Sequence, residues 1–113
     1  MGITTEIEQL ELNIKDAKHV IKLKKSLDAL RKNKDFDLVI LDEYFIGEAS
    51  RLVQQKSAVH AQTPERQMFI DHGIVGLGSL QQFFAKIDAM YNEAQRSLEA
   101  DQITHAELLG EEA

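Results

Sequence analysis

Apolar side chains recur at alternating spacings of four and three residues near the start of the chain, and no other feature constrains the fold as strongly. The positions are Ile3, Ile7, Leu10, Ile14, Ala17 and Ile21, here called the N-terminal seam. This spacing places all of them on one face of an α-helix, as in the heptad pattern of a coiled coil. Because the 113 residues include only one Pro and six Gly, little interrupts helix formation. The sequence therefore predicts a long first helix over residues 4–33, capped by Thr4 or Thr5.

A second apolar series in the same segment faces another direction. Its members are Val20, Leu23, Leu27 and Leu30. At about 100° per residue, this series lies well over about 90° around the helix from the N-terminal seam. Two packing partners, one for each half of the helix, would explain the change of face. Drift of a single face around a curved core is the alternative.

Two further helices are expected after a polar break at residues 33–35. Asp35 is the expected N-cap of a helix over 36–57, although residues 38–41 alone would also fit a short buried strand. After a loop at 57–62, Thr63, Pro64 and Glu65 combine a capping side chain, a preorganised first helical residue and a favourable negative charge. They predict a third helix that ends near Leu98. Residues 101–113 carry four acids and no Lys or Arg, and we expect an acidic tail there that is either frayed or ordered by a partner.

The predicted fold is all-α, with three main helices of which the first and third are long. They form a helical hairpin or bundle in one domain over residues 1–100. A core of this size is modest, and association often supplements it. Together with the split apolar faces of the first helix, this favours a chain that self-associates as a homo-oligomer.

The composition excludes several classes of protein. The chain has no Cys, which rules out disulfides, thiolate nucleophiles and Cys-based zinc sites. No stretch approaches the roughly 18 apolar residues that span a membrane, and the first six residues lack the basic start and apolar run of a signal peptide. The formal charge of −6 argues against nonspecific binding of nucleic acid over the whole surface. These features predict a cytoplasmic protein without a membrane partner.

No set of residues predicts catalysis or a cofactor. Gly73, Gly76 and Gly78 match neither a dinucleotide-binding nor a Walker motif, and instead predict a kink or a close approach of another backbone. The four His do not pair at metal-ligand spacing, and no Ser lies in a nucleophile-elbow motif. We therefore expect no enzyme, no metal and no cofactor. The candidate interface residues are Ile3, Ile7, Leu10, Ile14, Ile21, Gly73, Gly76 and Gly78.

Positive charge gathers in one segment. Residues 15–34 carry eight Lys or Arg against two Asp, so charge is segregated along the chain. A lysine face follows one side of the first helix and consists of Lys15, Lys18, Lys22, Lys25 and Lys32. A solvated helix face is the favoured interpretation. An acidic protein partner and nucleic acid rank behind it, since Arg and interleaved aromatic residues are missing.

Several stretches resemble small helical proteins of tailed bacteriophages of about this length. They are residues 34–45, 48–53, 62–67 and 74–84, with a weaker likeness on either side. The resemblance implies a phage origin and a place in the host bacterial cytoplasm or the virion. It implies no catalytic residues.

These expectations combine into one leading function and two alternatives. The leading one is a non-enzymatic phage protein that acts by protein–protein contacts, as a small structural or virion-assembly component. The first alternative is a modulator that binds a host protein of transcription, replication or defence, because an acidic surface can occupy a basic groove. The second, ranked last, is a nucleic-acid-binding module that uses the lysine face.

Overall fold

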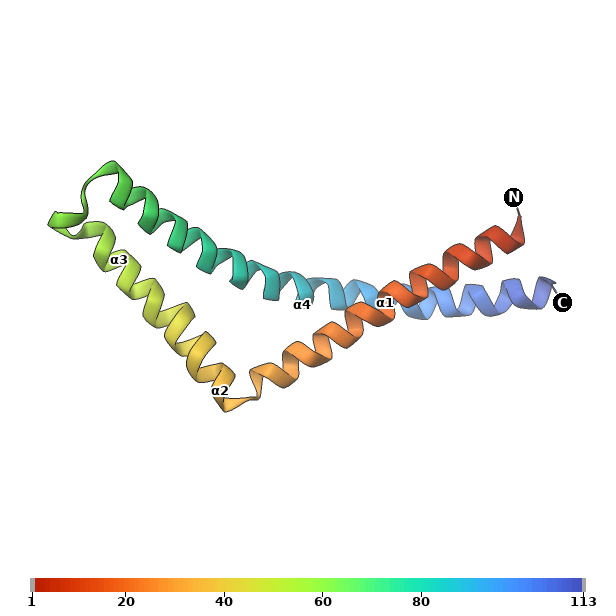
Figure 1. The fold of residues 1–113 in the computed structure, drawn as a ribbon. Helices are drawn as coiled ribbons and strands as arrows, with labels where there is room; N and C mark the ends of the chain where they lie inside the picture. Colours follow the sequence, from red (N-terminus) through yellow and green to blue (C-terminus); the bar gives the residue numbers. More distant parts are fainter. Residues whose placement is uncertain (1, 113) are drawn as a thin grey trace. The chain divides into compact units, whose positions relative to one another are not determined.

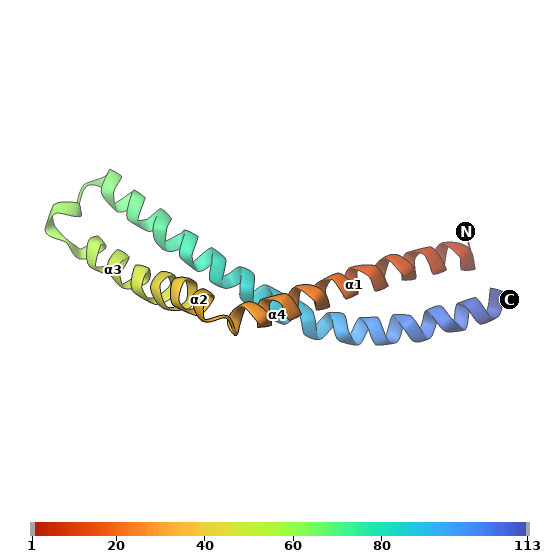
Figure 2. The same ribbon diagram turned by 60° about the horizontal axis from the view of Figure 1, so that its bottom comes forward.

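The computed structural model describes residues 2–112, and within this range all regular structure is helical and no strand occurs (Figures 1 and 2). The prediction of an all-α fold with long first and last helices is confirmed. In chain order the elements are α1 (Ile3–Arg31), α2 (Lys34–Phe36), the π-helix η1 (Asp37–Glu48), α3 (Ala49–Ser57), the 3₁₀-helix η2 (Val59–Ala61) and α4 (Pro64–Glu112).

Packing divides the chain into two compact units. Unit 1 contains residues 1–26 and 86–113, and unit 2 contains residues 27–85. Both α1 and α4 continue from one unit into the other without a break in the helix. The single domain expected over residues 1–100 stays a prediction.

In unit 1 the first part of α1 runs beside the last part of α4 in the opposite direction (Figures 1 and 2). Ile7 and Ala17 of α1 are buried, as are Ile87 and Ala94 of α4. The half-buried Lys24 donates a hydrogen bond from Nζ to Asp88 Oδ1 at 2.8 Å. The heptad spacing therefore produces a two-helix packing that includes the charged pair of Lys24 and Asp88.

The expected end of the third helix near Leu98 is wrong, because α4 continues to Glu112. Asp101, His105 and Leu108 are half-buried and extend the spacing of three and four from Leu98. His105 Nε2 lies 3.1 Å from Glu11 Oε1 of α1. Packing against α1 therefore stabilises the helix over residues 101–112, although the composition of this segment alone favours fraying.

In unit 2, α2, η1 and α3 form one helical segment over residues 34–57 that pairs with the first part of α4. The strand alternative for residues 38–41 is wrong, because these residues lie in η1. Lys56 Nζ of α3 contacts Asp71 Oδ1 of α4 at 2.6 Å. Leu52, Ala61 and Ile70 form the buried cluster that joins α3, η2 and α4.

The middle of this segment, η1, is a π-helix with i→i+5 hydrogen bonds. From Phe36 onward its half-buried residues include neighbouring pairs four positions apart, namely Phe36 and Asp37, Ile40 and Leu41, and Tyr44 and Phe45. An α-helix keeps one face inward with spacings that alternate between three and four, so this repeat of four departs from the α-helical pattern.

The cap expected at the start of the third helix is confirmed. Thr63 Oγ1 accepts a hydrogen bond from the Arg66 backbone N–H at 3.3 Å, and Pro64 is the first residue of α4. The side-chain amide of Gln67 then donates to the carbonyl oxygens of Lys56 and Ala61. These bonds fix the turn between α3 and α4.

The other two expected caps are wrong. Asn33, not Asp35, caps the second helical segment, because Asn33 Oδ1 accepts hydrogen bonds from the backbone N–H groups of Asp35 and Phe36. Thr4 and Thr5 lie inside α1, which already begins at Ile3. Asn33 and Asp35 can both cap, and Asn33 does so because its backbone is extended just before the helix begins.

Candidate interaction surfaces

The part of α1 that carries the N-terminal seam, expected as an interface with another chain, lies beside α4 within unit 1 (Figures 1 and 2). Ile7 and Ala17 are buried, and the other members, Ile3, Leu10, Ile14 and Ile21, are half-buried. The seam thus has a partner inside the chain. Its use between chains stays a prediction, and the half-buried members are the part of it that another chain could reach.

The second apolar series is only partly used. Leu27 is buried and Val20 is half-buried, whereas Leu23 and Leu30 lie exposed. Half of this series therefore remains open to a further packing partner.

The three glycines of α4 differ in their surroundings. The helix runs through all of them, and none has a positive φ. A Cβ built on Gly73 would lie 3.1 Å from Leu52 Cδ2, whereas Gly76 and Gly78 have no such neighbour within 4 Å. At Gly73 the neighbour is therefore the Leu52 side chain of α3 rather than another backbone. At the other two positions the open space leaves room for a neighbour from outside.

The lysine face is exposed at all five positions, Lys15, Lys18, Lys22, Lys25 and Lys32. The first four belong to unit 1 and Lys32 belongs to unit 2. Lys24, which has only 18% of its side chain exposed, turns instead toward Asp88. Its ammonium also lies 5.8 Å from the centroid of the Tyr91 ring. The lysines that remain exposed can attract acidic groups, but no aromatic ring is interleaved with them for base stacking.

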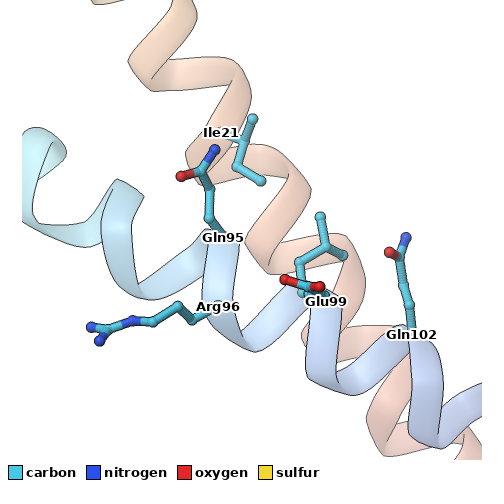
Figure 3. Close-up of a pocket in the computed structure, with 6 residues that line it drawn as sticks. Ile21, Gln95, Arg96, Glu99 and Gln102 are labelled. Carbon is cyan, nitrogen blue, oxygen red and sulfur yellow. The ribbon is translucent and has the colours of Figure 1, made fainter.

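Open grooves occur between α1 and α4 in unit 1. The groove in Figure 3 has a volume of about 450 Å³ and is formed by Ile21 of α1 with Gln95, Arg96, Leu98, Glu99 and Gln102 of α4. Another has a volume of about 340 Å³ and contains the small side chains Ala17, Ala94 and Ser97 with an acidic rim of Asp16, Glu93 and Asp101. Apolar floors with amide and charged rims suit the binding of another helix or peptide.

An aromatic cluster in unit 2 was not predicted from the sequence. Phe84 lies 6.1 Å from Phe36, 5.9 Å from Phe45 and 6.2 Å from Phe83 between ring centroids, and Tyr44 extends the cluster beside Phe45. Five of the seven aromatic residues of the chain thus gather at one place. The sequence feature that could have predicted this cluster is the concentration of Phe and Tyr in residues 36–45 and 83–84.

The described residues hold no group of three or more His, Asp or Glu side chains placed to bind a metal ion. Over the same part of the chain, no helix combines the length and apolarity that a membrane crossing demands. The chain matches no protein-family model, and comparisons with curated proteins and with solved structures return no match.

Proposed function

We propose that this chain is a non-enzymatic bacteriophage protein that acts by protein–protein contacts, as a small structural or virion-assembly component. The phage setting rests on the resemblance of residues 34–45, 48–53, 62–67 and 74–84 to small helical phage proteins. All of these stretches fall within unit 2. The proposal that the chain acts by protein–protein contacts is based on the exposed apolar side chains of the same unit.

The observation that carries the proposal is the amount of apolar surface that unit 2 leaves exposed. Within residues 27–85, eleven large apolar side chains are exposed, whereas only five hydrophobic residues are buried. Phe69 has 79% of its surface exposed and Val59 has 92%. Burial of exposed apolar side chains against a partner is favourable, so these side chains support interaction with other proteins. The number of exposed apolar side chains in unit 2 supports a function in which partner proteins bury them.

The test is the location of the protein during infection. We expect mass spectrometry to find the chain in purified particles or in isolated assembly intermediates. Synthesis late in infection, measured in a time course, would agree with this role. Absence of the chain from both particles and intermediates would contradict it.

The alternative function, modulation of a host protein, is favoured by the charge of α4 in unit 1. Residues 88–111 carry six acids and one Arg, and this segment is helical throughout. A rigid acidic helix can occupy a basic groove that normally binds nucleic acid. Early synthesis, together with recovery of one host protein by affinity purification from infected cells, would support this alternative over assembly.

Nucleic-acid binding through the lysine face ranks last. Phosphate contacts from Lys15, Lys18, Lys22 and Lys25 would give an affinity that falls steeply with salt concentration. A gel-shift assay at low salt tests this, and the absence of a shift removes the possibility.

A further inference from the structure

Two heptad-like series of residues run along α4 in unit 2. The first, here called the buried seam, consists of Ile70, Gly73, Leu77, Leu80 and Phe84, which are buried or half-buried. The second, here called the exposed seam, lies one residue earlier at each position and consists of Phe69, His72, Gly76, Ser79 and Phe83. It is rotated by about 100° from the buried seam, and all five of its residues are exposed.

The composition of the exposed seam is unlike that of a solvated helix face. Charged residues make up 28% of the chain, but the exposed seam has no Asp, Glu, Lys or Arg. Phe69 and Phe83 are 79% and 52% exposed. Between them lie the small residues Gly76 and Ser79, and Gly76 has no atom near the position of a Cβ. Small residues between large apolar ones let a second helix approach closely.

The two Phe residues of the exposed seam are placed symmetrically about Gly76. Phe69 precedes it by seven residues and Phe83 follows it by seven. In an antiparallel pairing centred on Gly76, Phe69 of one copy therefore faces Phe83 of the other, and the reverse contact forms at the other end. A surface that matches itself in this way suits a two-fold interface, and aromatic pairs add attraction beyond the area that they bury.

The charges that flank the exposed seam agree with this direction. Along the sequence, the same spacing of three and four leads to Glu65 before the seam and to Lys86 after it. An antiparallel pairing brings opposite charges together at the two ends, whereas a parallel pairing brings like charges together.

We propose that a second copy of this chain docks on the exposed seam, antiparallel, with the two Gly76 residues at the crossing. This deepens the proposed function and rests on it, since it names one of the surfaces through which the chain acts and the partner that occupies it.

The experiment uses two charge variants of the full chain, Phe69→Glu and Phe83→Lys. Sedimentation equilibrium over a range of concentrations is expected to show a wild-type dimer. Each variant alone is expected to raise the dissociation constant by at least about a hundred-fold, because both copies lose a buried ring and gain a desolvated charge. An equimolar mixture of the two variants is expected to restore the dimer. In the mixed pair, the introduced carboxylate of one copy faces the introduced ammonium of the other, while the two remaining Phe still pair.

The control is Val75→Glu, which places the same charge on a side chain of α4 that is 65% exposed and lies outside the seam. It is expected to leave the dissociation constant unchanged, and circular dichroism is expected to show the wild-type helix content in all variants.

A wild-type chain that stays monomeric, or single variants that pair as tightly as wild type, would overturn the proposal. Single variants that are monomeric and are not restored by mixing would overturn the antiparallel register. Failure of this pairing leaves the detection of the chain in phage particles as a separate result, so the two proposals can fail independently.

Discussion

Replacing Gly73 and Gly78 by Ala tests whether the packing of α3 on α4 is as close as the structure indicates. Ala in place of Gly inside a helix stabilises it by about 0.5–1 kcal/mol, because the unfolded chain loses less freedom on folding. At Gly78 no atom lies within 4 Å of the new Cβ. Gly78→Ala is therefore expected to raise the free energy of unfolding by this full amount.

At Gly73 the same substitution meets Leu52. The new Cβ would lie 3.1 Å from Leu52 Cδ2 and 3.4 Å from Leu52 Cδ1, closer than the roughly 3.5–4.0 Å of a favourable carbon contact. Leu52 is only 7% exposed and packs in the cluster with Ala61 and Ile70, so it has little space into which to move. Overpacking of a core costs about 1–3 kcal/mol. After the helix gain is subtracted, Gly73→Ala is expected to lower the free energy of unfolding by about 1 kcal/mol.

The assay is urea denaturation followed by circular dichroism, at a concentration at which the chain is monomeric so that association does not contribute. A double-mutant comparison isolates the contact: in a Leu52→Ala background, which itself costs about 2–5 kcal/mol, Gly73→Ala is expected to stabilise the chain. Equal stabilisation by Gly73→Ala and Gly78→Ala in the wild-type background would refute the close approach of α3 to α4.

Three further substitutions test other parts of the fold by the same denaturation assay. Asp88→Ala is expected to lower the free energy of unfolding by about 1 kcal/mol, because the side chain of Lys24 is only 18% exposed; Arg96→Ala, in an exposed ion pair, is the control and should have little effect. Ala94→Leu is expected to cost about 1–3 kcal/mol, since Ala94 is buried in the packing of α1 on α4, and an unchanged midpoint would show that this packing is loose. Asn33→Ala is expected to cost about 1 kcal/mol through loss of the cap on α2; no loss of stability would mean that water replaces the cap.

Helix type and the approximate starts of the helices could be predicted from local pattern. The N-terminal seam predicted α1 because a spacing of four and three has only one regular backbone that keeps it on one face. Thr63 and Pro64 predicted the start of α4 because capping and the fixed φ of Pro act within a few residues. Residues 36–57 were expected to be helical, but the π-helix within them was missed, because apolar spacing does not distinguish its i→i+5 hydrogen bonds from those of an α-helix.

What the sequence by itself determined was an all-helical chain with regularly spaced apolar faces. Tertiary structure alone decided which surfaces are used within the chain. The N-terminal seam packs on α4, and Gly73 fits against Leu52, whereas Phe69 and Gly76 stay exposed on the same helix. Apolar spacing shows that a helix face needs a partner, but it carries no information about which partner. That depends on contacts between residues far apart in the sequence, which local propensity does not encode.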